Sequence, residues 1–231
     1  MDSLEAELAR ARDLSEVELA DAIEAIGFEC TRCGACCTAA SCDDAAADDS
    51  GTEDHTATVF PDEIRRLQGA DDGGEKGADW RDVARPVPYG LDEGEDGLEG
   101  ETFEWALQTD GCGDCVFYEE TDGAGACTVH PDRPLICRTY PFSVALGGTS
   151  QPMGEAVDRE GLVRAHECEG LGRDISRADA EELAAALKER AIRELREAIA
   201  VRDTYEPTAT ETGEIVVHDS EGAKRPDGTE R

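Results

Sequence analysis

Apolar residues recur at helical spacing along the first 26 residues, and acidic residues fill many of the positions between them. Such a stripe is typical of amphipathic helices that pack on one side. Ser15 and Glu18 have the spacing of a helix-capping box, and Gly27 is a suitable helix end. We therefore expect acidic helices over residues 3–26. The apolar positions of the stripe are Leu4, Leu8, Leu14, Val17, Ala22 and Ile26.

A second, longer helix is predicted near the end of the chain. Ser176 and Asp179 again have capping-box spacing, and an apolar stripe follows them. We expect this helix over residues 177–203. Its apolar side comprises Leu183, Leu187, Ile192, Leu195 and Ile199.

Short apolar segments between these helices predict strands, and turn-forming residues separate them. The expected strands are residues 58–60, 102–107 and 140–146. Pro61, followed by Asp62 and Glu63, predicts the start of another helix, because proline suits the first helical position and acids suit the first turn.

Two segments have the composition of solvated chain. Residues 69–100 are rich in Gly, Asp and Glu and are expected to form an acidic insertion. Residues 204–231 are expected to form an acidic tail, and we expect His218 within it to be solvated. The predicted parts of the chain are a helical appendage (1–27), a cysteine-bearing domain (28–176), a helix packing on that domain (177–203) and the tail (204–231).

The net charge of −33 on 231 residues changes this picture, because it sets the conditions under which the chain can fold. Lysine is nearly absent, which together with the acid excess indicates adaptation to molar salt, where charge repulsion is screened. We expect a protein of a halophilic archaeon; the alternative is an acidic interaction protein at ordinary ionic strength. The charge argues against nucleic acid and anionic membranes as partners.

Apolar content is low as well: Leu, Ile, Val and Phe together make 40 of the 231 residues. With such a charge, this composition borders on that of disordered chains, so something besides burial must help to hold the fold. The start of the chain has no secretory signal pattern and no segment is long and apolar enough to span a membrane. We therefore expect a cytoplasmic location.

The cysteines indicate what else could hold the fold. Four of them, Cys30, Cys33, Cys36 and Cys37, lie within eight residues, and six more follow. C-x2-C repeats bring thiolates within reach of one zinc ion or iron–sulfur cluster. In a cytoplasmic chain, ten cysteines favour metal over disulfides. The adjacent pair cannot easily form a disulfide with itself, so we expect its two sulfurs to point to different partners.

These features together predict an α+β fold. We expect a small metal-organised domain in which short strands and loops carry the cysteines and helices flank them. The first three cysteines have the spacing of three ligands of a [4Fe–4S] cluster, yet tetrahedral zinc accepts C-x2-C pairs equally. The sequence leaves open both the choice of metal and the division of the cysteines between one centre and two.

The motifs resemble those of the YkgJ-type cysteine-cluster family, known for its CxxCxxCC domain and described as zinc- or iron-chelating. The resemblance runs from about residue 28 to 176 through FECTRCGACC, TVFPDEIRRL, CVFY, ACTVHPDRPLICRTYPF and CEGLGRDIS. It implies eight metal ligands, namely Cys30, Cys33, Cys36, Cys37, Cys115, Cys127, Cys137 and Cys168. The last segment departs from the family pattern, with Glu169 in place of proline and Asp174 in place of glycine. Cys42 and Cys112 match no family position and are interpreted as small buried side chains.

Two arginines near Cys137 are candidates for supporting the metal or cluster. Arg133 and Arg138 lie in HPDRPLICRTYPF, where guanidinium groups can offset the negative charge of thiolates and donate hydrogen bonds to sulfur. The alternative is an ordinary surface ion pair.

Three functions fit these residues. A binding module with a structural or redox metal is favoured, because no motif demands a substrate. Some relatives are flagellin lysine methylases that use S-adenosylmethionine, which makes methyl transfer the alternative, although no Gly-rich cofactor loop is present. A third possibility is metal delivery or redox sensing through Cys42 or Cys112, but their acidic neighbours would raise the thiol pKa and make them poor sensors. The sequence thus favours a non-enzymatic protein with no assigned catalytic residue.

Overall fold

The protein has an α+β fold, as predicted, and its chain divides into two compact units that are described separately. Unit 1 comprises Met1–Cys33 and Leu135–Ile199, and unit 2 comprises Gly34–Pro134 and Ala200–Arg231. A computed structural model describes residues 3–39, 55–70, 78–94, 97–146, 155–156, 161–208, 210 and 212–231. None of the described helices is both long enough and apolar enough to cross a membrane.

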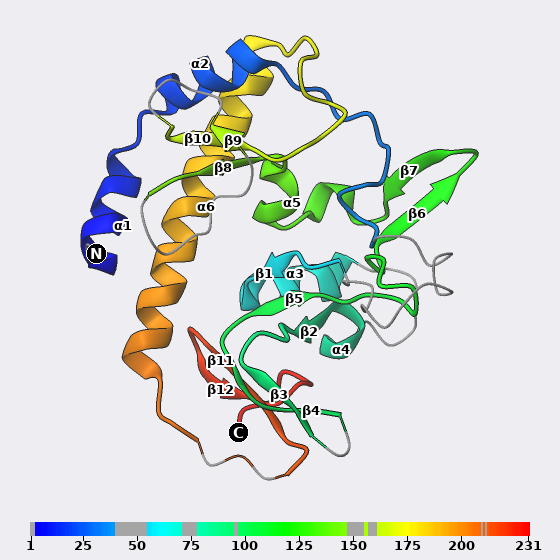
Figure 1. Ribbon diagram of the computed structural model, residues 1–231, viewed down its shortest axis with the longest axis vertical. Coiled ribbons are helices and arrows are strands. Elements are labelled where there is room, and N and C mark those ends of the chain that lie inside the picture. Colours follow the sequence, from blue (N-terminus) through cyan, green and yellow to red (C-terminus); the bar gives the residue numbers. More distant parts are fainter. Residues whose placement is uncertain are drawn as a thin grey trace. The chain divides into compact units, whose positions relative to one another are not determined.

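Unit 1 combines helices with one small antiparallel sheet (Figure 1). In this sheet β10 lies between β8 and β9, and Val163 of β10 pairs with Val144 of β8. Its elements are α1 (Leu4–Asp13), α2 (Glu16–Ile26), α5 (Leu135–Thr139), β8 (Phe142–Val144), β9 (Glu155–Ala156), β10 (Val163–Ala165) and α6 (Arg177–Thr204), whose last turn belongs to unit 2.

The helix ends of unit 1 follow the predicted capping signals. The Ser15 hydroxyl accepts a hydrogen bond from the backbone N–H of Glu18 at 3.3 Å, and α2 ends at Gly27. Gly27 has φ +74°, and a Cβ there would lie 2.1 Å from the carbonyl oxygen of Arg173. Only glycine allows this turn and this close approach. At the start of α6, the Asp179 N–H donates to the Ser176 hydroxyl at 3.1 Å.

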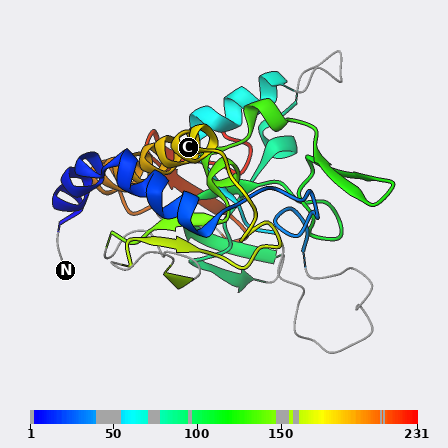
Figure 2. The same ribbon diagram turned by 90° about the horizontal axis from the view of Figure 1, so that it is seen from above.

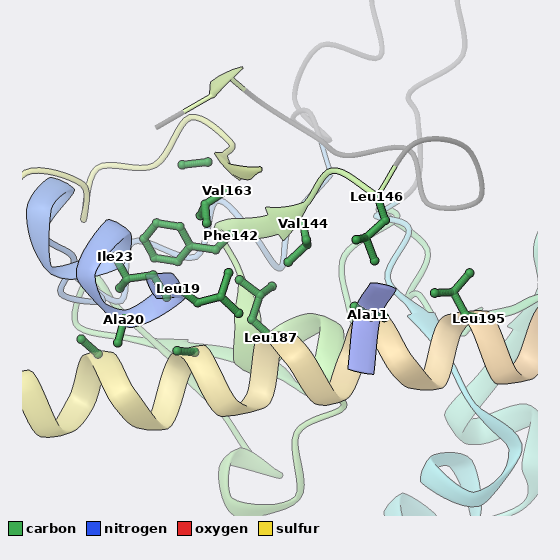
Figure 3. Packing of buried hydrophobic residues seen from close by; sticks show 14 of the residues in the cluster. Ala11, Leu19, Ala20, Ile23, Phe142, Val144, Leu146, Val163, Leu187 and Leu195 are labelled. Atoms are coloured by element: carbon green, nitrogen blue, oxygen red, sulfur yellow. The ribbon is translucent and has the colours of Figure 1, made fainter. Parts of the chain in front are cut away.

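A single apolar core holds unit 1 together. Side chains from α2 and β8 meet those of α6, as Figure 3 shows for Leu19, Phe142 and Leu187. Each of these three side chains is at most 1% exposed. Phe28 packs edge-on against Phe142 with ring centroids 5.7 Å apart. Burying such side chains contributes about 1.5–3 kcal/mol each relative to leaving them exposed.

Unit 2 is built mainly from short strands. Its described strands form a three-stranded sheet (β1-β5-β2), a four-stranded sheet (β12-β11-β4-β3) and the β6–β7 hairpin, which projects as an arm in Figures 1 and 2. The strands are β1 (Thr58–Val59), β2 (Ala84–Pro86), β3 (Leu91–Gly94), β4 (Gly97–Thr102), β5 (Trp105–Leu107), β6 (Tyr118–Thr121), β7 (Ala124–Cys127), β11 (Ile215–Asp219) and β12 (Gly222–Lys224). The helices are α3 (Pro61–Ala70), α4 (Trp80–Val83) and the 3₁₀ helix η2 (His130–Asp132).

A buried polar network joins the C-terminal hairpin of unit 2 to the rest of that unit. Asp219 is 1% exposed and accepts hydrogen bonds from the Trp105 indole N–H at 2.9 Å and from the Lys224 ammonium at 2.7 Å. Lys224 also bonds Glu221 at 2.6 Å and lies 5.4 Å from the centre of the Trp80 ring. Asp219 and Lys224 therefore each have a partner of opposite charge. Buried charged groups require such partners.

The structure differs from the sequence-based expectation in two acidic segments. Residues 204–231, expected to be a tail, include β11 and β12, and β11 pairs in parallel with β4. Within the expected insertion at 69–100, residues 80–86, 91–94 and 97–100 lie in helix and strand. The 204–231 segment pairs with β4, over a hundred positions away, whereas β3 and β4 form a local hairpin. The acidic composition of the two segments reveals neither pairing.

His218, expected to be solvated, is 3% exposed in β11. Its Nε2 atom lies 2.8 Å from Oε1 of Glu101, and its ring stacks on Phe103 with centroids 5.6 Å apart. The expectation failed because the strand that carries His218 is paired on both sides, which places this side chain in the interior.

Candidate metal centre

All eight cysteines predicted as metal ligands are free thiols, and they divide equally between the two units. Unit 1 contains Cys30, Cys33, Cys137 and Cys168, whereas unit 2 contains Cys36, Cys37, Cys115 and Cys127. The division falls inside the first motif, after Cys33. Cys115 is buried, Cys30 and Cys33 are exposed, and the others have intermediate exposure.

In unit 2 the second half of the first motif forms a tight turn. The N–H groups of Cys37 and Thr38 both donate to the carbonyl oxygen of Gly34, at 2.7 and 3.1 Å. Gly34 has φ +81°, and a Cβ on it would lie 2.2 Å from the hydroxyl of Tyr118. Glycine is therefore needed here for the backbone conformation and for packing against β6.

This turn holds the two adjacent thiols together. The Sγ atoms of Cys36 and Cys37 lie 3.8 Å apart and share a hydrogen bond. The structure thus places the two sulfurs next to each other, and the expectation that they have different binding partners stays a prediction.

Cys115 and Cys127 are brought near the turn by backbone contacts. The Cys115 N–H donates to the Cys37 carbonyl oxygen at 2.8 Å, and the Ala39 N–H donates to the Asp114 carboxylate at 2.7 Å. Cys127 is the last residue of β7 and pairs across the hairpin with Tyr118. The hairpin thus presents Cys127 beside the residue that covers Gly34.

Burial and neighbouring charges shift the pKa values of these thiols. The hydrogen bond with Cys37 lowers the pKa of Cys36 to about 7; burial opposes this shift and the charge of Arg133 adds to it. Burial raises the pKa of Cys115 to about 11, and the nearby charges of Cys127 and Cys36 raise it further. Burial also raises the pKa of Cys127, against the effect of Arg133. A bound cation would lower the pKa values that burial raises, because its positive charge stabilises the thiolates.

In unit 1 the first half of the motif lies beside the segment that carries Cys168. The Glu29 N–H donates to the Gly170 carbonyl oxygen at 3.0 Å, next to Cys30. Cys168 Sγ accepts a hydrogen bond from the Gly170 N–H at 3.4 Å, an interaction that favours a thiolate. Between Cys30 and Cys33, Arg32 has φ +59°, a conformation uncommon for residues other than glycine.

Cys137 is joined to the Cys168 segment through the residues that follow α5. The Tyr140 hydroxyl donates to the carbonyl oxygen of Glu167 at 2.9 Å, and the His166 N–H donates to the carbonyl oxygen of Pro141 at 2.9 Å. Tyr140 also packs edge-on against His166, with centroids 5.9 Å apart. Cys137 and Cys168 are therefore carried by two segments that lie side by side.

The two candidate arginines belong to different units. Arg133 acts electrostatically on both Cys36 and Cys127, and its Nε atom donates to the His130 carbonyl oxygen at 3.3 Å. Arg138 is an exposed residue of α5 in unit 1, one position after Cys137. The structure thus brings Arg133 to the thiols of unit 2, whereas the part played by Arg138 stays a prediction.

Cys112 departs from its interpretation as a small buried side chain, because it is disulfide-bonded and partly exposed. Cys42, the other cysteine outside the family motifs, lies outside the described residues. The expectation that this chain uses its cysteines for metal and not for disulfides therefore needs correction at Cys112. A lone cysteine in a Gly- and Asp-rich loop carries no local signal of its partner.

The donor chemistry suits zinc or iron, since all eight side chains are free thiols and soft metals select thiolate. Cys36 and Cys37 are already at a separation that one ion can bridge. Among the described residues, however, no three histidine, cysteine, aspartate or glutamate side chains are grouped so that they could hold a metal ion. Binding must therefore draw the remaining sulfurs inward, which couples metal affinity to local folding.

No pattern in the sequence points to two residues that support the site. Asp114 fixes the backbone after Cys37, and Tyr118 covers Gly34. Their partners are about 75 to 84 positions away in the chain, so neither periodicity nor motif spacing could reveal them.

Comparison with known proteins identifies the family. Residues 29–169 match the family model CxxCxxCC, described as "Putative zinc- or iron-chelating domain". No curated protein and no solved structure matches the chain. The matched range covers more than half of the chain and includes all eight predicted ligands. The chain therefore belongs to the CxxCxxCC family of zinc- or iron-chelating domains.

Proposed function

We propose that this protein binds zinc or an iron–sulfur cluster through eight thiolates and that the metal has a structural or redox role. The ligands are Cys30, Cys33, Cys36, Cys37, Cys115, Cys127, Cys137 and Cys168, supported by Arg133 and Arg138. The observation that carries the proposal is the Cys36–Cys37 thiol pair, 3.8 Å apart, on a turn hydrogen-bonded to the Cys115 backbone. Neighbouring thiols in such a turn serve metal coordination better than they serve packing.

A structural role is supported by the way the cysteine segments are built. The turn at 34–38 and the Cys115 loop are joined by backbone hydrogen bonds and one carboxylate, and the strands of the β6–β7 hairpin are mostly exposed. Structural zinc contributes about 10–16 kcal/mol to folding in small zinc-finger peptides. A bound ion would therefore supply order that this part of the chain otherwise lacks.

A cytoplasmic location and a high-salt environment are part of the same proposal. Reducing conditions keep thiols available for metal, and molar salt screens the charge of −33. The alternative, methyl transfer from S-adenosylmethionine, rests on resemblance to flagellin lysine methylases alone and stays a prediction.

The test is anaerobic purification in molar KCl followed by elemental analysis for iron, zinc and inorganic sulfide. We expect metal bound in a fixed ratio to protein, and a visible absorption band if the metal is an iron–sulfur cluster. Chelation should lower the ordered structure of residues 34–39 and 110–134, measured by amide hydrogen exchange. Cys112→Ser is the control: it removes a cysteine outside the eight, and with it the disulfide of Cys112, and should keep full metal content. A protein that takes up neither iron nor zinc when these are supplied under reducing conditions would overturn the proposal.

A further inference from the structure

The equal division of the eight thiols between the two units bears on how many metal centres the protein has. Four thiolates are the full complement of a structural tetrahedral zinc site, and each unit contains four. The division point, between Cys33 and Gly34, splits the first motif into two pairs. Each pair shares its unit with two cysteines from later in the chain.

The spacing of the Cys36–Cys37 pair indicates what kind of centre unit 2 holds. Two thiolates bound to one tetrahedral ion at about 2.3 Å each lie about 3.8 Å apart. The observed distance between the two sulfurs is 3.8 Å. In a [4Fe–4S] cluster each cysteine binds a different iron, which separates the sulfurs further. The two sulfurs therefore have the spacing of two ligands on one ion. When the thiols are protonated, the S–H···S hydrogen bond between them has this same spacing.

The other two ligands of unit 2 come from the segments packed on this turn. Cys115 is tied to the Cys37 carbonyl oxygen by its own N–H, and Cys127 lies on the hairpin strand opposite Tyr118, which covers Gly34. Both are close enough to Cys36 for their charges to interact. Arg133 faces the same group and offsets part of the excess negative charge of four thiolates on a divalent ion.

In unit 1, hydrogen bonds join the segments that carry Cys30, Cys137 and Cys168. Cys30 follows Glu29, which is hydrogen-bonded to Gly170, and Gly170 in turn donates to the sulfur of Cys168. A Cβ on Gly170 would lie 2.4 Å from the Glu29 carbonyl oxygen, so the two segments approach as closely as glycine allows. Cys137 is joined to the same segment through Tyr140 and Glu167.

We propose that the eight thiols form two separate four-cysteine metal centres, one within each unit, and that the unit 2 centre is a single tetrahedral ion bound by both Cys36 and Cys37. The unit 1 centre uses Cys30, Cys33, Cys137 and Cys168; the unit 2 centre uses Cys36, Cys37, Cys115 and Cys127. This inference rests on the proposed function, because it divides the ligands named there.

Paired variants test the division. Cys127→Ser should lose the metal of unit 2 and keep that of unit 1, and Cys168→Ser should do the reverse. Elemental analysis should therefore show loss of one centre in each variant, with protection of the other set from maleimide alkylation mapped by mass spectrometry. Loss of all metal in both variants, or loss of inorganic sulfide in Cys127→Ser, would overturn the inference.

A second test uses the protein without substitutions, so it does not depend on whether a variant folds. Zinc-loaded protein is treated with increasing chelator and pulsed with maleimide. The eight thiols should become reactive in two groups of four, each confined to one unit. Eight thiols that become reactive together would overturn the division while leaving metal binding intact. Full reactivity before any chelator is added would instead overturn the proposed function.

Discussion

The two units keep their folds by different means, although both come from the same acidic chain. Unit 1 has one continuous apolar core, in which side chains of α2 and α6 pack with those of a small sheet. Unit 2 also buries large apolar side chains, among them Ile64 and Leu67, and adds a buried network around Asp219 in which each charged group is paired. The comparison shows that both units bury apolar side chains, whereas the buried ion pair of Asp219 and Lys224 is a feature of unit 2.

The largest expected effect comes from breaking the polar network. Asp219→Ala leaves the Lys224 ammonium and the Trp105 indole N–H buried without Asp219. Losing one partner of a buried ion pair costs about 3–5 kcal/mol of unfolding free energy. Both tryptophans of the chain, Trp80 and Trp105, lie in unit 2, so tryptophan fluorescence during urea unfolding reports on this unit.

The double variant Asp219→Ala/Lys224→Met is the control, because it removes both charges. It should recover much of the lost stability, since replacing a whole buried pair by apolar groups is often nearly neutral. Equal loss in the single and double variants would show that the network contributes by packing and not by charge pairing.

A somewhat smaller loss is expected from the apolar core. Leu187→Ala empties a fully buried position of α6 and should cost about 2–5 kcal/mol of unfolding free energy. Circular dichroism at the helical minimum is the suitable probe, because α1, α2 and most of α6 belong to unit 1. Val17→Ala, at a position that is 60% exposed on α2, should change stability by less than about 0.5 kcal/mol. Similar losses in both variants would contradict the core assignment.

The smallest effect should be a pH dependence in unit 2. The hydrogen bond from Arg65 lowers the pKa of Glu221 to about 2, against its partial burial and with help from Lys224. Because the folded-state pKa is below the unfolded value, this stabilisation is present above about pH 4.3 and is lost as the pH falls toward 2. Glu221→Gln should therefore flatten the fluorescence-detected stability between pH 5 and 3; an unchanged slope would contradict the role of this carboxylate.

The same contrast explains how much the sequence could predict. In unit 1 the helices and their ends were predictable, because Ser15, Gly27 and Ser176 act on residues within a few positions. In unit 2 the pairing of Ile215 with Gly100 joins residues over a hundred positions apart, and acidic composition concealed both strands. His218 was misjudged for the same reason.

The candidate centre was predictable in its residue types and not in its geometry. Motif resemblance supplied the eight cysteines, all of which are free thiols. The separation of Cys36 and Cys37, the disulfide at Cys112 and the parts played by Asp114 and Tyr118 depend on how distant segments pack. Local spacing cannot encode such contacts.

The interleaving of the two units has a consequence for synthesis on the ribosome. Unit 1 begins with the first helix but is complete only when Ile199 has emerged, and unit 2 waits for the final hairpin, β11–β12. During translation, therefore, Cys30 and Cys33 are exposed to the cell long before Cys168 is made. The nascent chain must pass through a stage with unpaired thiols and neither unit closed, and no simple truncation can yield either unit alone.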